Sequence, residues 1–279
     1  MWFIELLKAI LIGIVEGITE WLPISSTGHM ILLDEFIKLD VSDEFKEMFF
    51  VVIQLGAIIA VPLLFWQKLN PFSGRKSAEE KKRTFDIWKK VIIGVIPAAV
   101  LGFLFDDILE EKLYNSTVIS IALIVYGIAF ILVEFFKSKQ KKEYRVLTVD
   151  ELSYKDALVI GAFQVLSLIP GTSRSGSTIL GGMLTGVSRV AAAEFSFFMA
   201  IPVMLGASFL KIVKFIIEGF SATPFEIALL LIGSIIAFAV SYFVIKFLMD
   251  FVKRHSFTAF GVYRIILGAL VLGYFLIAK

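Results

Sequence analysis

Long apolar stretches dominate this chain, and short polar segments separate them. Six stretches have lengths and compositions that suit a membrane crossing: 48–66, 91–105, 117–136, 195–217, 225–248 and 259–278. A helix needs about 17–25 residues to cross a bilayer, so the short stretch 91–105 is expected to extend at one end. The pattern therefore predicts an all-α polytopic membrane protein.

Four further apolar segments form two interrupted pairs. The segments of the second pair, 157–169 and 177–187, are each too short to span, and the chain is expected to be on the same side before and after them. We therefore predict a re-entrant hairpin there. The first pair, 2–22 and 28–39, is expected to do the same, although 2–22 is just long enough to span alone.

The basic residues of the connecting segments suggest an orientation. Lys and Arg gather in three segments: 67–90, 137–155 and 249–258. Far fewer occur in the alternating connections, which are 37–47, 106–116 and 218–224. The positive-inside rule places the first set in the cytoplasm and the second set outside. The first hairpin then enters from the outside and the second from the cytoplasm.

The two halves of the chain look related. Three residues of the first half recur at one constant offset in the second, because Gly13, Ser25 and Gly28 become Gly161, Ser173 and Gly176. An odd number of crossings per half makes the second copy inverted, and inverted repeats with broken helices place a polar site near the bilayer midplane. We predict a single membrane domain over 1–279: repeat 1 at about 1–136, a basic cytoplasmic linker at about 137–155, and repeat 2 at about 156–279.

The composition agrees with a membrane protein and excludes several kinds of site. The 279 residues are 58% hydrophobic, against about 45–50% in soluble domains. The chain has no Cys and two His, which excludes disulfides, thiolate metal sites and a His-rich metal centre. The net charge of +2 gives no indication of nucleic-acid binding. Glu5 and Lys8 interrupt the first apolar segment, so it is expected to belong to the mature protein rather than to a signal peptide.

Two carboxylates occur inside the first apolar segment. Glu16 and Glu20 are four residues apart, which puts them on one helical face about one turn from each other. Such a pair can share a divalent cation, or repulsion and burial can keep one of them protonated as an acid. The alternative is two solvated surface charges, which the apolar neighbours disfavour.

A run of hydroxyl residues follows Pro23. Ser25, Ser26 and Thr27 stand where a second helix is expected to begin, so an ordinary capping role is one interpretation. Free backbone N–H groups and the positive end of the helix dipole also suit a phosphate there. His29 is three residues after Ser26 and can lie over the same turn. A single His on an apolar helix is often a packing residue, but these neighbours favour a functional one.

Arg174 occupies the middle of the second interruption. Small and hydroxyl residues surround it: Gly171, Thr172, Ser173, Ser175, Gly176 and Ser177. Glycines allow close backbone approach, and hydroxyl and N–H groups can cradle phosphate oxygens. Arginine adds a permanent charge and a bidentate fork, so lysine is not expected to replace it. Pairing with a structural carboxylate is the alternative. We expect the two interruptions to meet and form one anion site.

These motifs resemble a known family. Residues 16–29 read Glu-Gly-Ile-Thr-Glu-Trp-Leu-Pro-Ile-Ser-Ser-Thr-Gly-His, and residues 170–176 read Pro-Gly-Thr-Ser-Arg-Ser-Gly. The chain resembles the undecaprenyl-diphosphate phosphatases, the integral-membrane bacitracin-resistance proteins of bacteria. Further likeness lies at 52–56, 94–98, 186–189 and 194–197. The resemblance runs over nearly the whole chain, with no departure at a motif position.

The resemblance implies an activity and its residues. It implies hydrolysis of undecaprenyl diphosphate to undecaprenyl phosphate and inorganic phosphate, which recycles the lipid carrier for peptidoglycan synthesis and confers bacitracin resistance. It assigns the activity to Glu16, Glu20, Ser26, His29 and Arg174 and requires a divalent cation. Mg²⁺ or Ca²⁺ would be held by Glu16 and Glu20. The implied location is the bacterial inner membrane, with an active site open to the periplasmic face.

The order of chemical events stays open at the level of the sequence. Ser26 is the expected nucleophile, with His29 or Glu20 taking its proton, and the rival is attack by water or His29 while Ser26 only binds. We expect substrate contacts from nine further residues: Ser25, Thr27, Gln54, Gly171, Thr172, Ser173, Ser175, Gly176 and Ser177.

A transporter is the competing class of function. Inverted repeats and broken helices are also typical of carriers, so a flippase of polyprenyl phosphate lipids is the alternative. A carrier needs no nucleophile, whereas the sequence supplies one in Ser26. The expected partners are the polyprenyl diphosphate substrate and membrane lipids, and a homodimer is compatible with the sequence. Arg264, beside Tyr263, is expected to extend its charged end to the inner membrane surface.

Overall fold

The computed structural model describes residues 2–140 and 143–278, and helices make up most of this part of the chain. The hairpin helices are α1 (Trp2–Thr19), α2 (Ser26–Phe36), α7 (Tyr154–Val165) and α8 (Arg174–Leu184). The long helices are α3 (Asp43–Leu64), α5 (Ala78–Leu113), α6 (Ser116–Gln140), α9 (Arg189–Ile217), α10 (Pro224–Arg254) and α11 (Thr258–Ala278). The short helix α4 (Trp66–Leu69) and two 3₁₀ turns (Val149–Glu151 and Leu166–Leu168) complete the described elements.

Six of these helices are long and apolar enough to cross a membrane. They are α3, α5, α6, α9, α10 and α11, which confirms the six predicted spans and the all-α polytopic class. The expected extension of 91–105 occurs at both ends, because α5 covers Ala78–Leu113. The four hairpin helices are not among the candidate spans, as expected for segments that enter the bilayer and return.

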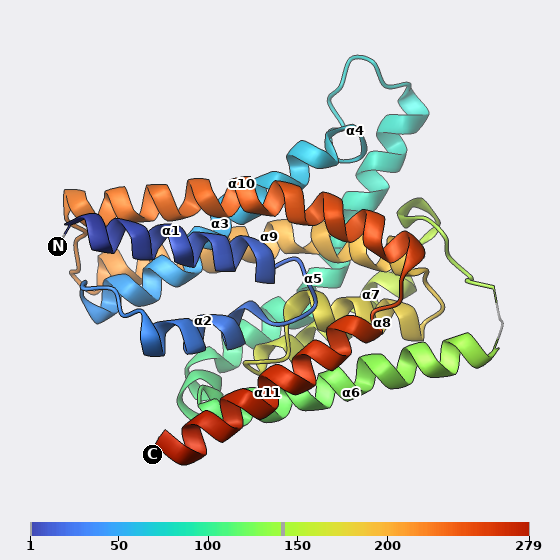
Figure 1. Ribbon diagram of the computed structural model, residues 1–279. Coiled ribbons are helices and arrows are strands. Elements are labelled where there is room, and N and C mark those ends of the chain that lie inside the picture. Colours follow the sequence, from blue (N-terminus) through green and yellow to red (C-terminus); the bar gives the residue numbers. More distant parts are fainter. Residues whose placement is uncertain (1, 141–142, 279) are drawn as a thin grey trace.

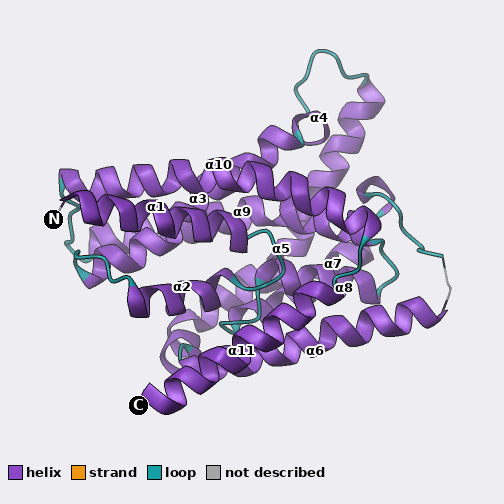
Figure 2. Cartoon of the chain, in the orientation of Figure 1, coloured by secondary structure: helices purple, strands orange, loops and turns teal. Residues whose placement is uncertain are grey.

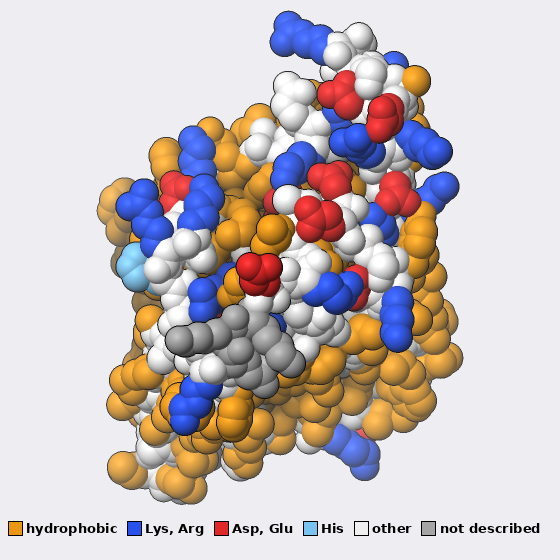
Figure 3. Space-filling view, turned by 90° about the vertical axis from the view of Figure 1, so that its right-hand side faces the viewer, with side chains coloured by type: hydrophobic (Ala, Val, Ile, Leu, Met, Phe, Trp, Pro, Cys, Tyr) orange, Lys and Arg blue, Asp and Glu red, His pale blue; other side chains and the backbone are white. Residues whose placement is uncertain are grey.

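The three basic connections lie at one end of the molecule and the three others at the opposite end (Figure 1). Viewed end-on, the basic end carries a dense group of Lys, Arg, Asp and Glu, and a hydrophobic belt surrounds it (Figure 3). Two ion pairs with buried carboxylates lie at this end: Lys68 contacts Glu194 at 2.5 Å, and Arg189 pairs with Glu134. The arrangement is the one that the positive-inside rule requires of a membrane protein.

Glycines let helices from the two halves approach closely. A Cβ on Gly13 of α1 would lie 2.6 Å from the carbonyl oxygen of Gly233 in α10. A Cβ on Gly161 of α7 would overlap the carbonyl oxygen of Gly94 in α5. Each hairpin thus packs on a long helix of the other half. The inverted relation and the repeat boundaries stay predictions.

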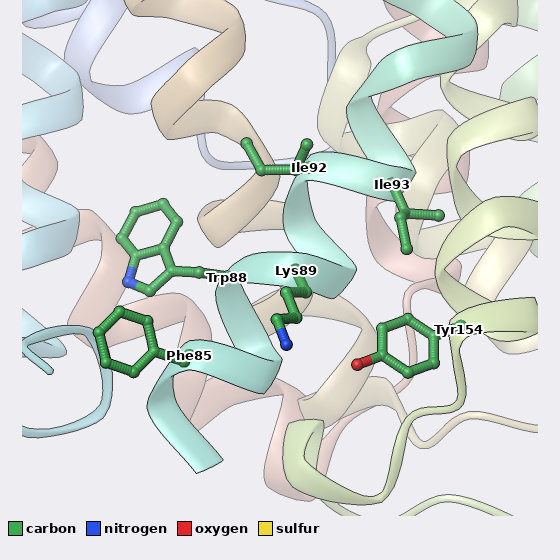
Figure 4. A pocket seen from close by; sticks show the side chains of 6 residues that line it. All are labelled: Phe85, Trp88, Lys89, Ile92, Ile93 and Tyr154. Atoms are coloured by element: carbon green, nitrogen blue, oxygen red, sulfur yellow. The ribbon is translucent and has the colours of Figure 1, made fainter. Parts of the chain in front are cut away.

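The loops of the two hairpins lie within the helical layer rather than at its ends (Figure 2). A separate hollow of about 640 Å³ opens beside α5 (Figure 4), and its lining residues are Phe85, Trp88, Lys89, Ile92, Ile93 and Tyr154. None of the predicted site residues lines this hollow. The internal loops are therefore the place to look for the site.

Candidate active site

Glu16 and Glu20 lie at the end of α1, inside the protein. Glu16 is in the last turn of the helix, and the backbone N–H of Glu20 donates to the carbonyl of Glu16 at 3.0 Å. Only 1% of Glu16 and 7% of Glu20 is exposed. The alternative of two solvated surface charges is therefore wrong. Carboxylates this deeply buried need cations or hydrogen-bond donors.

A serine begins the second helix of each hairpin in the same strained way. Ser25 has φ 75° and Ser173 has φ 74°, a left-handed conformation that costs a non-glycine residue about 1–2 kcal/mol. Ser25 Oγ accepts from the N–H of Gly28 at 3.3 Å, and Ser173 Oγ accepts from that of Gly176 at 3.1 Å. The predicted capping role is confirmed for Ser25, and the structure shows the same role for Ser173. Strain that is held in place by other contacts often marks a functional site.

Glu20 joins the two hairpins through a single carboxylate. Ser26 Oγ donates to Glu20 Oε2 at 2.7 Å. The other oxygen, Oε1, accepts from Arg174 Nη2 at 3.2 Å. The structure thus brings together a hydroxyl, a carboxylate and a guanidinium from segments about 150 residues apart in the sequence. The expectation that the two interruptions meet is confirmed by these contacts.

Arg174 is buried at the start of α8, with 10% of its side chain exposed. Its Nη1 donates to the Ser196 carbonyl of α9 at 2.8 Å, and its guanidinium lies 5.9 Å from the Trp21 ring. Arg174 does pair with a carboxylate, as the alternative held, but that carboxylate is Glu20 of the predicted site. Its Nε has no partner among the described residues, so one donor is left for a ligand.

Several predicted substrate-binding hydroxyls make contacts within the protein. Ser175 Oγ donates to the carbonyl oxygens of Glu20 at 3.2 Å and Leu22 at 3.4 Å, which ties the second loop to the first. Ser177 is fully buried and donates to the carbonyl of Arg174 at 3.0 Å. These hydroxyls fix the loops, and their expected contact with substrate stays a prediction.

The remaining predicted binding residues are less closely tied to this centre. Thr172 is fully buried and Thr27 is half-buried beside Ser26. Gln54 is half-buried on α3, and no hydrogen bond within the described chain joins it to the loops. Gln164 of α7, which matches Glu16 in the proposed repeat, is 1% exposed, and neither of its amide atoms has a partner among the described residues. We add Gln164 to the candidate site residues because its buried amide has no partner in the described chain. The sequence signal that could have found it is its match to Glu16 in the proposed repeat.

His29 is held at both ring nitrogens. Nδ1 lies 2.7 Å from the Ser25 carbonyl, and Nε2 lies 2.7 Å from the Tyr263 hydroxyl of α11. A carbonyl only accepts, so Nδ1 carries a proton, and in the neutral ring Nε2 accepts from Tyr263. The Ser26 hydroxyl donates to Glu20, so the geometry favours Glu20 over His29 as the group that takes the Ser26 proton. Sequence reasoning missed Tyr263 as a partner of the site.

Arg264 contacts both loops from inside the protein. The prediction that its charged end reaches the inner membrane surface is therefore wrong. The side chain is fully buried. It donates to the carbonyls of Pro23 at 3.2 Å, Gly171 at 2.8 Å and Leu123 at 3.4 Å. The error arose because the rotation of α11 depends on its packing against α6. The sequence did contain a signal for a functional role of Arg264. It is a charged residue about two turns inside an apolar stretch, and charged residues in such positions are usually functional.

Unpartnered buried atoms mark where a ligand can bind. Besides Arg174 Nε, they include Glu16 Oε1 and Trp21 Nε1. Buried polar atoms normally have partners, so these positions suit water, an ion or substrate. In the described part of the chain no three His, Cys, Asp or Glu residues are arranged so that they could hold a metal ion by themselves, so a cation would need ligands from substrate or water. Mg²⁺ is commonly bound by one or two carboxylates together with substrate phosphates, which fits Glu16 and Glu20.

Comparison with known proteins places the chain in a family. Residues 9–270 match the family model of the bacitracin resistance protein BacA. The chain belongs to this family. It is 58% identical to undecaprenyl-diphosphatase of Enterococcus faecalis over 276 residues, which is 99% of both chains. It is also 58% identical to that of Acetivibrio thermocellus over 276 residues, 99% of this chain and 100% of the relative. Undecaprenyl-diphosphatase 1 of Clostridioides difficile is 56% identical over 272 residues, 98% and 97% of the two chains. A family of membrane phosphatases agrees with the buried loops described above.

Proposed function

We propose that this protein hydrolyses undecaprenyl diphosphate to undecaprenyl phosphate and inorganic phosphate. Full-length relatives at 56–58% identity are named undecaprenyl-diphosphatase. The structural observation that carries the proposal is the Glu20 carboxylate, which accepts from Ser26 on one oxygen and from Arg174 on the other. A hydroxyl poised on a carboxylate beside a fixed cation is suited to phosphoryl transfer.

The geometry supports Ser26 as the nucleophile. Ser26 Oγ attacks the terminal phosphorus while Glu20 Oε2 accepts its proton. The bond from this phosphorus to the bridging oxygen breaks, and Glu20 passes the proton to the departing undecaprenyl phosphate. Glu20 then takes a proton from a water molecule that attacks the phosphoserine. The bond from Ser26 Oγ to phosphorus breaks, Oγ regains the proton from Glu20, and inorganic phosphate is released. His29 is already held by Ser25 and Tyr263 in the same turn, which suits a positioning role.

Arg174 and the helix starts would bind the diphosphate. The free Nε of Arg174 and the N-terminal turns of α2 and α8 provide positive charge for phosphate oxygens. Glu16 and Glu20 would hold a divalent cation, Mg²⁺ or Ca²⁺, which would neutralise negative charge on those oxygens. Without such a cation, two carboxylates beside a phosphate site would repel the substrate.

The membrane setting follows from the fold. The protein is a multi-pass membrane protein, and the hydrophobic belt around its helices is suited to contact with lipid (Figure 3). We propose that it lies in the bacterial inner membrane with its active site open to the periplasmic face. The asymmetric distribution of Lys and Arg supports this orientation. A homodimer stays a prediction.

A test of this function measures chemistry where transport is impossible. Purified protein in detergent should release phosphate from a polyprenyl diphosphate when Mg²⁺ or Ca²⁺ is present. The control is Ser26→Ala, which should remove the release. If the wild-type protein released no phosphate with any divalent cation, the result would contradict the proposal and favour the carrier alternative. The carrier is not favoured, because it gives no reason for the Ser26–Glu20 contact.

A further inference from the structure

We propose that Arg264 is a positioning residue that sets the distance between the two active-site loops. The inference rests on the proposed phosphatase function but concerns a residue that the reaction itself does not use. Its guanidinium donates to the Pro23 carbonyl in the first loop and to the Gly171 carbonyl in the second. One rigid group thus fixes the backbone of both hairpins.

The two carbonyls occupy equivalent places in their loops. Pro23 lies two residues before the cap serine Ser25, and Gly171 lies two residues before the cap serine Ser173. Both cap serines are in the strained left-handed conformation. By donating to these two carbonyls, Arg264 therefore holds each loop at the residue where its strained turn begins. Such strain persists only where the surroundings hold it.

The partners of Arg264 differ from those of an ordinary buried arginine. In the described chain they are three carbonyl oxygens and the ring of Tyr126, which lies 5.6 Å from the guanidinium. Arg174 and Arg189, by contrast, pair with carboxylates. A planar fork can hold several carbonyls in one geometry, whereas a lysine ammonium is a flexible point charge. The hydrogen bonds from Arg264 to these carbonyls therefore depend on the planar fork of arginine.

The position of Arg264 depends on close packing between α11 and α6. A Cβ on Gly268, one turn beyond Arg264, would lie 2.8 Å from the Ser120 carbonyl oxygen of α6. Gly176 lies against the guanidinium itself, because a Cβ there would lie 3.3 Å from Arg264 Nη1. Arg264 thus connects the α6–α11 contact to the first turn of α8, which carries Arg174. A small shift of α11 should move the loops apart.

The test compares substitutions of Arg264 with a matched arginine at the far end of the protein. Arg264→Lys and Arg264→Met should lower kcat at least about tenfold while KM changes less than about threefold, because the loops lose alignment rather than a substrate contact. Arg189→Lys weakens the bidentate pair with Glu134 and should lower the unfolding temperature, but it should keep most of the kcat because that pair lies outside both loops. Near wild-type kcat in Arg264→Lys would overturn the proposal. A raised KM with unchanged kcat would also overturn it, in favour of direct substrate binding.

A second pair of variants decides the matter if the Arg264 variants do not fold. Gly268→Ala should displace α11 and lower kcat, whereas Gly273→Ala on the same helix has nothing within 4 Å of the added atom and should not. Equal kcat values in these two folded variants would overturn the proposal.

A readout without substrate separates this inference from the proposed function. Hydrogen exchange of residues 20–29 and 169–177 should speed up together in Arg264→Met or Gly268→Ala, but not in Gly273→Ala. If wild-type protein releases no phosphate, the proposed function fails while the exchange result still tests Arg264. Unchanged exchange in both loops would overturn the positioning role.

Discussion

His29 Nε2 and the Tyr263 hydroxyl lie 2.7 Å apart and connect the first hairpin to the last helix. Their rings stack in parallel with centroids 5.6 Å apart. Because Nδ1 is already bound to the Ser25 carbonyl, this hydroxyl fixes the orientation of the imidazole. The turn that carries Ser26 and His29 is therefore held from a helix that follows it by more than 200 residues.

Removal of the Tyr263 hydroxyl should slow the reaction without unfolding the protein. Tyr263→Phe keeps the stacked ring and loses one hydrogen bond. A hydrogen bond contributes about 0.5–1.5 kcal/mol, so its loss should lower kcat/KM by up to about tenfold. The measurement is steady-state phosphate release in detergent. Tyr274→Phe, on the same helix but against Phe36 and Phe275, is the control. A Tyr263→Phe variant with wild-type kinetics would show that the hydrogen bond is not needed.

Two adjacent serines should respond differently to alanine. Ser26 donates to Glu20, whereas Ser25 caps α2. Ser26→Ala should lower kcat at least about a thousandfold, the order expected for loss of a nucleophile. Ser25→Ala should lower the free energy of unfolding by about 1 kcal/mol and leave more activity. Single-turnover phosphate release and thermal unfolding distinguish them, and a Ser26→Ala variant with near-normal release would exclude Ser26 as nucleophile.

Gly171 should not tolerate a side chain. Its φ of 90° favours glycine, and a Cβ would lie 2.6 Å from the Ile119 carbonyl oxygen. Gly171→Ala should therefore cost more than about 1 kcal/mol of unfolding free energy and reduce activity through the second loop. Gly206→Ala is the control, since the added atom there meets nothing within 4 Å. Equal unfolding temperatures for the two variants would contradict this account.

Removal of divalent cations should stop phosphate release. A chelator would leave Glu16 without a cation and Glu20 with Arg174 as its cationic partner, which adds negative charge beside the substrate phosphates. Activity should return when Mg²⁺ or Ca²⁺ is added in excess, and Glu16→Gln should raise the concentration needed. Titration of activity against free cation measures both effects. Full activity in the presence of chelator would exclude the proposed cation.

Asp156 makes a pH-dependent contribution at the basic end of the protein. Burial by itself raises the pKa of Asp156, but hydrogen bonds from Arg145 and Ser153 outweigh burial and lower this pKa. A lowered carboxyl pKa contributes stability above the ordinary Asp value of about 3.9 and loses it as the pH falls through the folded value. Asp156→Asn should thus destabilise the protein at pH 7 by about 1 kcal/mol, since Arg145 is half-exposed.

Thermal unfolding at several pH values tests this contribution. The difference between wild type and Asp156→Asn should persist to about pH 4 and shrink below it. The control is Asp250→Asn, whose Lys253 partner is 55% exposed and whose loss should change little at any pH. A difference that grows as the pH falls would reverse the assigned sign.

The sequence by itself predicted the six spans and three residues that meet in the candidate site. Apolar run length identified six spans, because the thickness of a bilayer fixes the length of a helix that crosses it. Pro, Gly and hydroxyl residues located both loops, because these residues act on the backbone next to them. Glu20, Ser26 and Arg174 stood out as polar groups in apolar surroundings, and the structure brings these three together.

The tertiary structure decided which groups share a contact. It assigned the Ser26 proton to Glu20, joined His29 to Tyr263, and placed Arg264 behind both loops instead of at the membrane surface. It left Gln54 without a hydrogen bond to the loops in the described chain. These outcomes depend on how α11 and α3 are rotated and packed against other helices. Apolar periodicity fixes that a helix is buried, but the rotation that aims one side chain follows from close contacts such as those of Gly268 with α6.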